Sequence, residues 1–258
     1  MKLLIFLGSV RKSSPPKPAR HGERVAKACQ RCLLEQYSDH DIELIDPLDY
    51  ELDPIFKPHF AYSQAEVPKK LDDLAEKIKA SDGFIMVSPE YNHSMSPALA
   101  NLLNHFGSSL FAYKPSVIVT YSAGQWGGVR AAVGMRSFLS ELGCLPVSAM
   151  IHVPKAQDVF IESGETNKEA EQASWREYFS RSFNQLMWWA EAASKQREEL
   201  DPKQLIKDFK RDPSQRTLII SYGVLVSSLG VSKIACFSWS DKMIQSNISS
   251  LVRPQPLQ

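Results

Sequence analysis

Five short apolar runs alternate with longer helical patterns along this 258-residue chain. Several runs are apolar at almost every position, which is typical of strands that are covered on both faces of a parallel sheet. Such alternation of strands and helices predicts a three-layer α/β domain with right-handed crossovers. The expected strands are Lys2–Leu7, Ile42–Ile45, Phe84–Val87, Val117–Tyr121 and Val147–Val153.

Between these runs, apolar residues recur at steps of three and four, which predicts helices that pack one face on the sheet. The longest such stripe consists of Trp175, Phe179, Phe183, Leu186, Ala190 and Ala193. The expected helices are Glu23–Tyr37, Lys69–Ala80, Pro97–Phe106, Val129–Leu142 and Glu169–Arg197.

The net charge of +1 gives no electrostatic support for nucleic acid as a partner. No apolar run reaches the roughly 18 residues that a membrane span needs. The apolar start at Lys2–Leu7 also ends too early for a secretory signal. We therefore expect a cytoplasmic protein that binds neither nucleic acid nor membrane.

The charge is unevenly spread, which places a boundary near Leu200. Residues 200–258 hold eight Lys and Arg against four Asp and no Glu, a net charge of +4, whereas residues 1–199 carry −3. A segment of this length is close to the lower limit for an independent hydrophobic core. We expect residues 1–199 to form the functional domain and residues 200–258 to form a basic, Ser-rich tail that is mostly irregular.

Cys29 and Cys32 form a Cys-x-x-Cys pair, which invites a redox or zinc interpretation. No second Cys or His pair completes a zinc ligand set. The pair also lies inside a predicted helix, whereas a redox pair is expected at a helix N-terminus that stabilises its thiolate. We therefore interpret both as ordinary helix cysteines, kept reduced in the cytosol, and expect no metal site.

In an open parallel sheet, ligands bind beyond the carboxyl ends of the strands, where the strand order reverses. The first loop at that edge is Gly8-Ser9-Val10-Arg11, which leads through Arg20 into a helix. Its hydroxyl, its backbone N–H groups and its guanidinium groups suit a phosphate at a helix N-terminus. Dinucleotide and nucleotide-hydrolase phosphate motifs are absent, so a monophosphate fits better than a pyrophosphate. An ordinary surface loop explains this segment equally well.

The next two loops at the same edge also carry unusual residues. Tyr91-Asn92 offers an aromatic face and an amide that can hydrogen-bond the edge of a planar heterocycle. The segment Ser122–Gly128 has three Gly in five residues, which permits close approach to a flat ligand. Trp126 either stacks on a ligand ring or covers the loop.

Together these loops resemble those of the NADPH-dependent FMN reductase family, which has a flavodoxin-like fold. The resemblance covers roughly residues 2–197, and three motifs in order at the ends of strands are more specific than any one alone. It implies a doubly wound, five-stranded parallel sheet in the order 2-1-3-4-5, with FMN and NADPH as cofactors. The matching segments are Gly8–Arg11, Pro89–Asn92, Pro97–Asn101, Ser122–Gly124, Gly127-Gly128, Arg130–Arg136 and Leu142-Gly143.

By this resemblance, the first loop binds the FMN phosphate, the second lines the isoalloxazine ring and the third closes over the flavin. The segment Lys12–Ala19 departs from the compact loop that is usual in the family and is predicted to be an insertion. The candidate cofactor contacts are Ser9, Arg11, Arg20, Pro89, Glu90, Tyr91, Asn92, Ser122, Ala123, Gly124, Gln125, Gly127 and Gly128.

The resemblance implies an enzyme that passes hydride from NADPH to the flavin and on to a quinone, free flavin or azo dye. Because the cofactor carries this chemistry, we nominate no side chain as catalytic acid or base. His93 is interpreted as a surface residue, and Glu23 and Glu90 as partners of helix dipoles. A homodimer is implied by the resemblance alone.

Two other classes of function stay open. An FMN-binding electron carrier would need strong charge for docking, and a net charge of −3 over residues 1–199 offers little. A flavin-binding regulatory protein would use the basic tail as its partner surface. Steady-state NADPH oxidation separates the enzyme from the electron carrier. For a regulatory protein, deletion at residue 200 would abolish partner binding but spare NADPH oxidation.

Overall fold

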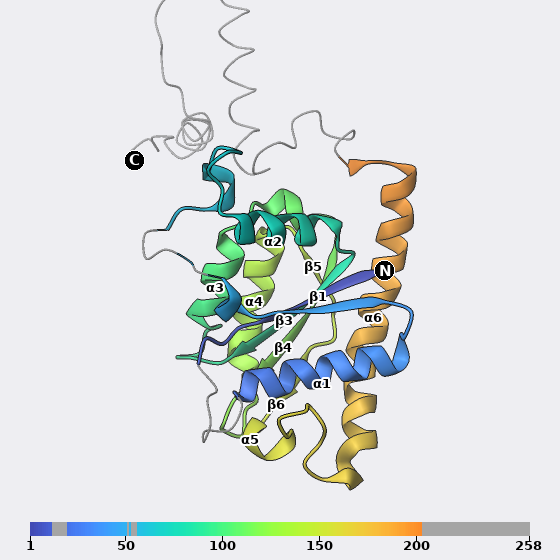
Figure 1. Ribbon diagram of the computed structural model, residues 1–258. Helices are drawn as coiled ribbons and strands as arrows, with labels where there is room; N and C mark the ends of the chain where they lie inside the picture. The colour runs from blue at the N-terminus through green and yellow to red at the C-terminus, as the bar shows by residue number, and fades with distance from the viewer. Residues whose placement is uncertain (12–19, 51, 53–55, 203–258) are drawn as a thin grey trace, which may run out of the picture. The chain divides into compact units, whose positions relative to one another are not determined.

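The computed structural model describes residues 1–11, 20–50, 52 and 56–202, and these form a parallel β-sheet between two layers of helices (Figure 1). Within the described residues the sheet has six strands in the order β2-β1-β3-β4-β5, with β6 also paired to β4. All five pairings are parallel. The strands are β1 (Lys2–Leu7), β2 (Asp41–Ile45), β3 (Gly83–Pro89), β4 (Pro115–Tyr121), β5 (Leu145–Pro146) and β6 (Ile151–Val153).

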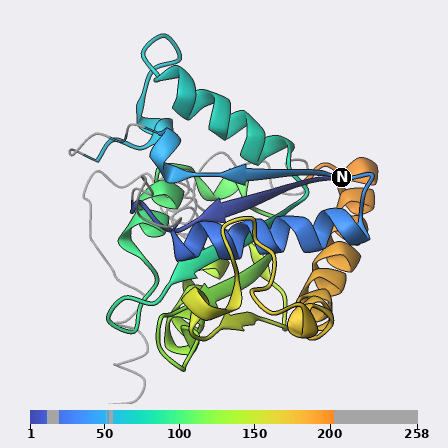
Figure 2. The ribbon, with the colours of Figure 1, turned by 60° about the horizontal axis from the view of Figure 1, so that its bottom comes forward.

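The helices cover both faces of the sheet, as Figures 1 and 2 show. Helices α1 and α6 pack on one face and α2, α3 and α4 on the other. Their bounds are α1 (His21–Gln36), α2 (Lys69–Ala80), α3 (Pro97–Asn104), α4 (Val129–Glu141), the short α5 (Ala156–Val159) and α6 (Gln172–Glu199). Short 3-10 turns are η1 (Pro47–Asp49), η2 (His59–Ala61), η3 (Ser108–Leu110) and η4 (Glu169–Glu171).

Strand β1 shows why the sheet needs both layers. Leu3, Ile5 and Leu7 face the core that α1 and α6 complete, whereas Leu4 and Phe6 face the core beneath α2, α3 and α4. All five side chains are fully buried. A strand that is apolar on both faces therefore fixes the three-layer arrangement. This confirms the predicted fold class and strand order.

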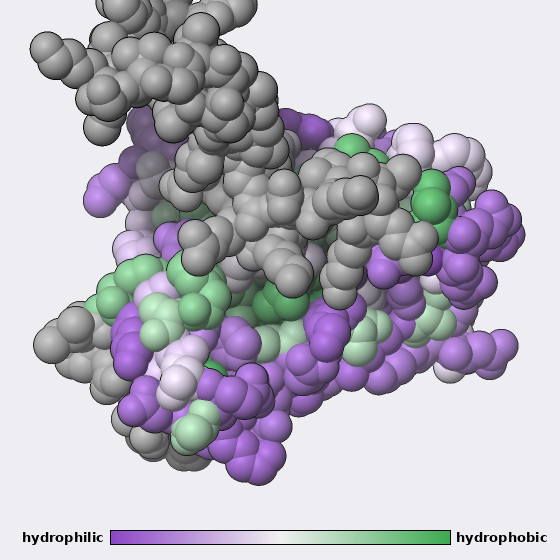
Figure 3. Space-filling view, turned by 90° about the horizontal axis from the view of Figure 1, so that it is seen from above, coloured by the Kyte–Doolittle hydropathy of each residue, from purple (hydrophilic) through white to green (hydrophobic). Residues whose placement is uncertain are grey.

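The predicted stripe on α6 also packs as expected. Phe179, Phe183, Leu186 and Ala190 are buried against the sheet, and Trp175 packs at the edge of the same core. The opposite side of the helix faces solvent. On the one face that Figure 3 shows, hydrophilic residues make up most of the described surface, with groups of hydrophobic residues among them.

The fifth strand differs from the expected Val147–Val153, because it is split into β5 and β6. Side chains from two helices replace the sheet partner in the gap. Arg136 of α4 donates to the carbonyl oxygens of Val147 and Ser148 at 3.1 and 2.6 Å. The N–H of Ala149 donates to Oε1 of Gln185 on α6 at 3.0 Å. The backbone of residues 147–149 is thus satisfied without a strand, and only Ile151–Val153 of the expected run forms one.

Two sequence-based expectations fall outside the described residues. These are the insertion Lys12–Ala19 and the tail from residue 203 onward. The described residues all belong to one compact unit, Met1–Asp212. None of the described helices is both long and apolar enough to cross a membrane.

Candidate functional site at the carboxyl edge of the sheet

The three predicted loops follow the carboxyl ends of β1, β3 and β4, which are neighbours in the sheet. Backbone hydrogen bonds join them there. The N–H of Gly8 donates to the carbonyl oxygen of Val87 at 2.7 Å, and the N–H of Glu90 donates to Tyr121 at 3.1 Å. The strand order reverses between β1 and β3, because β2 lies on the far side of β1. The loops therefore meet where open α/β sheets bind their ligands.

The first loop leaves β1 through a position that only glycine fits. A Cβ on Gly8 would stand 2.6 Å from the carbonyl oxygen of Val87. Ser9 is buried at 4% exposure, whereas Arg11 is exposed. The Arg11 guanidinium lies 5.9 Å from the centre of the Tyr91 ring, a cation–π contact that joins the first and second loops.

Arg20 fixes the first loop to the end of β2. Its Nη1 donates to the carbonyl oxygen of Ser9 at 2.7 Å, and both terminal nitrogens donate to the Asp46 carboxylate. Asp46 also accepts from the N–H of Leu48 at 2.9 Å. The terminal nitrogens of Arg20 are therefore already engaged within the protein, while its contact with an FMN phosphate stays a prediction.

Helix α1 begins beside this loop without a side-chain cap. Arg20 occupies the cap position and makes no capping hydrogen bond there. Nδ1 of His21 is buried and has no hydrogen-bond partner in the described part of the chain. Burial, then the charges of Arg24 and Arg11, lower the pKa of His21. The helix thus presents a positive end beside Arg11, which suits a phosphate group.

The second loop is a tight two-residue hairpin after β3. Tyr91 and Ser94 exchange two backbone hydrogen bonds of 2.9 Å. The two central residues, Asn92 and His93, have positive φ angles of 50° and 62° and are exposed. Pro89, the last residue of β3, is buried beneath them. The hairpin therefore holds Asn92 out from the sheet edge, and the surface interpretation of His93 is confirmed.

Glu90 links the second loop to the start of α4. Its carboxylate accepts from Nε and Nη2 of Arg130, at 3.1 and 3.0 Å. It also accepts from the backbone N–H groups of Arg130 and Ala131, at 3.2 and 3.3 Å. The carboxylate thus caps the positive end of α4, which confirms its interpretation as a helix-dipole partner.

The third loop uses its glycines in two different ways. Gly127 and Gly128 have φ angles of 60° and 82°. A Cβ on Gly127 would stand 3.0 Å from the nitrogen of Pro154, and one on Gly128 would stand 2.8 Å from Cβ of Thr120. The fold itself therefore requires these two glycines. Gly124 has no atom within 4 Å of such a Cβ, so it is the glycine open to a ligand.

The other members of this loop vary in exposure. Ala123, Gln125 and Trp126 are exposed, and Ser122 is partly buried. The hydroxyl of Ser122 donates to the carbonyl oxygen of Gly124 at 3.0 Å. The loop therefore presents a short exposed segment between an anchored start and two buried glycines.

Tyr121 is the residue at this edge that sequence reasoning missed. Its hydroxyl hydrogen-bonds Ser9 and lies 2.3 Å from the position of a Cβ on Gly22, so the first turn of α1 closes over it. Burial, then the neighbouring Tyr91, raise its pKa. An aromatic residue at the end of a strand and directly before a Gly-rich loop is the signal that could have found it.

The Cys-x-x-Cys pair lies away from these loops. Cys29 and Cys32 are buried in α1, and burial is the main cause that raises the pKa of both, that of Cys32 to about 11. A thiolate is disfavoured at either position, which agrees with ordinary helix cysteines. No group of three or more His, Cys, Asp or Glu within the described ranges could hold a metal ion.

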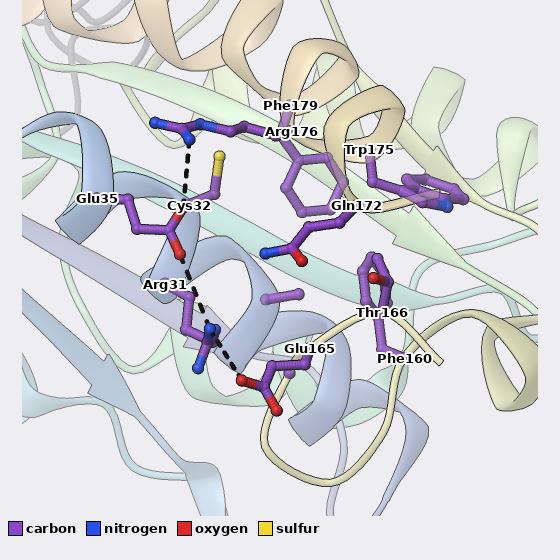
Figure 4. A pocket seen from close by; sticks show the side chains of 12 residues that line it. Arg31, Cys32, Glu35, Phe160, Glu165, Thr166, Gln172, Trp175, Arg176 and Phe179 are labelled. Atoms are coloured by element: carbon purple, nitrogen blue, oxygen red, sulfur yellow. Dashed lines mark ion pairs between the residues drawn. The ribbon is translucent and has the colours of Figure 1, made fainter. Parts of the chain in front are cut away.

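A small cavity of about 40 Å³ lies between α1, α6 and the segment 160–166, and shares no residue with the predicted cofactor contacts (Figure 4). A chain of ion pairs crosses it. Arg31 lies between Glu35 at 3.8 Å and Glu165 at 3.1 Å, and Arg176 lies 4.0 Å from Glu35. Because these charges pair with one another, the ion pairs hold α1 and α6 to the segment 160–166. We do not assign the predicted chemistry to this cavity.

The sheet order and the loops at its carboxyl edge define a flavodoxin-like α/β protein. A solved structure of a flavoenzyme NAD(P)H:(acceptor) oxidoreductase from Paracoccus denitrificans shares this fold, with a TM-score of 0.55 and 19% identity. The match covers 72% of this chain and 97% of the other.

A family model described as NADPH-dependent FMN reductase matches residues 1–158, which include all of the predicted cofactor contacts. The chain therefore belongs to the NADPH-dependent FMN reductase family. It is an NAD(P)H-dependent oxidoreductase with FMN and NADPH as cofactors.

Curated relatives agree with this assignment. An NADPH azoreductase of Bacillus sp. is 26% identical over 170 residues, which cover 66% of this chain and 84% of the relative. An FMN-dependent NADPH-azoreductase of Staphylococcus aureus is 31% identical over 126 residues, which cover 48% of this chain and 62% of that relative. An NADH:(hydroxy)cinnamate reductase subunit of Vibrio ruber is 31% identical over 151 residues, which cover 57% of this chain and 68% of that relative.

Proposed function

We propose that this protein takes hydride from NADPH on FMN bound at the carboxyl edge of the sheet and passes it to a small-molecule acceptor. The acceptor class is a quinone, a free flavin or an azo compound. One observation carries the proposal: Ser9 and Arg11 of the first loop, Tyr91 of the second loop and Tyr121 at the end of β4 meet at the carboxyl edge of the sheet.

The residues at this edge fit the phosphate end of FMN. Arg11 is exposed and has no carboxylate partner among the described residues, so its charge is available to a phosphate dianion. The first turn of α1 has no side-chain cap, which leaves its N–H groups to donate to the same ligand. Ser9 adds a hydroxyl that Tyr121 holds in place. We assign the phosphate contact to these groups.

The second and third loops fit the ring end of FMN. Asn92 presents an amide from the tip of the hairpin, and Gly124 offers backbone without a side chain. The ion pair of Glu90 with Arg130 ties the hairpin to α4, directly after the third loop. When bound, FMN supplies the hydride and electron transfer. The side chains orient it, and no catalytic acid or base is assigned.

The relatives direct the choice of acceptor. Two of them are named azoreductases, so an azo dye is the first acceptor to test. The exposed position of Asn92 and Gln125 leaves the predicted ring edge open, which suits planar acceptors of different sizes. We therefore expect a broad acceptor range rather than one tightly enclosed substrate.

The test is steady-state NADPH oxidation by the purified protein reconstituted with FMN, with and without an azo dye. An enzyme consumes many equivalents of NADPH and bleaches the dye, whereas an electron carrier shows a negligible rate of turnover. Bound flavin is visible in the absorption spectrum. A colourless protein that FMN does not reconstitute would contradict the proposal.

We further propose that residues 1–199 suffice for this activity, as a homodimer in the cytoplasm. The three described cysteines are free and buried, as a reducing compartment permits. A chain ending at Glu199 should retain bound flavin and NADPH oxidation. Loss of flavin from that truncated chain would show that the tail contributes to the site, and light scattering gives the oligomeric state.

A further inference from the structure

The gap between β5 and β6 borders a second pocket, of about 350 Å³. This volume lies within the range of small-molecule sites. The pocket shares no residue with the predicted flavin contacts. Its lining residues are Ser148, Ala149, Met150, His152, Arg181 and Gln185.

Two side chains of α6 bring hydrogen-bond donors to this pocket. Oε1 of Gln185 accepts from the N–H of Ala149 at 3.0 Å, so the amide nitrogen of Gln185 keeps its two N–H donors. Arg181 is exposed, and no Asp or Glu of the described residues forms an ion pair with it. Its guanidinium lies 5.7 Å from the centre of the Tyr178 ring. These donors are therefore available to a ligand that carries acceptor atoms.

His152 of β6 brings an acceptor. The hydroxyl of Thr120 donates to the carbonyl oxygen of Gly127 at 2.9 Å, so it must accept from Nδ1–H of His152 at 2.8 Å. Burial, then the charge of Arg181, lower the pKa of His152 and keep the imidazole neutral. In that tautomer Nε2 carries a lone pair.

The walls of the pocket are held in place. The hydroxyl of Tyr178 accepts from the N–H of His152 at 3.0 Å. Arg136 holds the carbonyl oxygen of Ser148 at 2.6 Å. His152 and Gln185 are therefore held in place before a ligand arrives, which lowers the entropic cost of binding.

We propose that this pocket binds a small hydroxycarboxylate. Its carboxylate accepts from the guanidinium of Arg181 and the amide of Gln185, and its hydroxyl donates to Nε2 of His152. Among the lining residues that the structure describes, Arg181 is the one charged group, so a monoanion balances its charge and a phosphate dianion leaves an excess negative charge. The proposal does not depend on the flavin site.

The test is titration of the full-length protein with lactate, followed by calorimetry and by the imidazole NMR signal of His152. Lactate should move that signal and bind more tightly than propionate, which lacks the hydroxyl. Arg181→Gln should weaken lactate binding by about tenfold or more, the loss expected for a charge-assisted hydrogen bond. Lys195→Gln, the same change of charge on an exposed residue of α6, should leave binding unchanged.

Several results would overturn the proposal. One is a His152 signal that stays fixed while lactate is added. Another is equal weakening by Lys195→Gln and Arg181→Gln, which would reveal general attraction to a basic surface. Phosphate that binds as tightly as lactate would contradict the monoanion, and propionate that does so would contradict the contact with His152.

Discussion

Nη1 of Arg20 donates to the carbonyl oxygen of Ser9 at 2.7 Å, from a side chain that is 5% exposed. The same guanidinium pairs with the carboxylate of Asp46 after β2. Asp46, directly after β2, thus holds Arg20, and Arg20 holds the loop that follows the neighbouring strand β1. A buried cation depends on its partner, because an uncompensated charge in the interior is costly.

Asp46→Ala should therefore lower the free energy of unfolding by about 3 kcal/mol, the usual cost of removing one partner of a buried ion pair. Urea denaturation measures this loss. Asp39→Ala changes an exposed carboxylate and should alter stability by less than about 0.5 kcal/mol. Equal stability of the two variants would mean that Arg20 does not depend on Asp46.

The helices and strands could largely be predicted because their patterns are local. Lys2–Leu7 and Lys69–Ala80 begin and end where the sequence places them, since each apolar pattern stops at a clear break. The split of the fifth strand could not be predicted in this way. It depends on Arg136 and Gln185, which reach the backbone from helices that are distant in the sequence.

The candidate site shows the same division. The three loops could be located because the end of each strand is visible in the sequence. The pairing of Arg20 with Asp46 could not be predicted, because the residues are 26 positions apart and meet only in the folded sheet. Tyr121 was counted as part of a strand, and its contacts with Ser9 and Gly22 depend on how α1 crosses that edge.

Cys29, Cys32 and Cys144 should resist alkylation in the folded protein at pH 8, although an ordinary thiol reacts there. Burial raises the pKa of each, to about 11 for Cys32 and about 12 for Cys144, and reaction needs the thiolate. Peptide mapping by mass spectrometry after iodoacetamide treatment measures this, with urea-unfolded protein as the reactive control. Rapid modification of the folded Cys29–Cys32 pair would restore the redox interpretation.

Gly164→Ala should destabilise the protein by about 2 kcal/mol, through overpacking and backbone strain. Gly164 has a φ of +84°, and a Cβ there would stand 2.5 Å from the nitrogen of Ala28 in α1. Gly134→Ala is the matched control, since the exposed helical Gly134 has open space around it. That change should stabilise by about 0.5–1 kcal/mol. Thermal or urea unfolding compares them, and a harmless Gly164→Ala would refute the close packing on α1.

The contribution of Lys114 to the free energy of unfolding should rise as the pH rises from 8 to 10.5. Its buried ammonium group donates to three carbonyl oxygens, those of Ile78, Lys79 and Leu110. Burial, then the charge of Arg197, lower its pKa from 10.5 to about 8. Between these values the unfolded chain still binds the proton that the folded chain has lost, so stability rises with pH.

The comparison of the parent with Lys114→Met isolates this effect, because both chains share every other titrating group. The difference in unfolding free energy should move in favour of the parent by up to about 3 kcal/mol across that window. Lys195→Met at the exposed end of α6 is the control for the removal of a lysine from the surface. A constant difference for Lys114→Met would contradict the lowered pKa.

The central claim is that the first loop holds the FMN phosphate, and the affinity of Arg11→Ala for FMN tests it most directly. The substitution removes a charge-assisted hydrogen bond, so FMN affinity measured by quenching of flavin fluorescence should fall by about ten- to a hundred-fold. Riboflavin lacks the phosphate and should bind the parent and the variant equally. An Arg11→Ala protein that binds FMN as tightly as the parent would contradict the account.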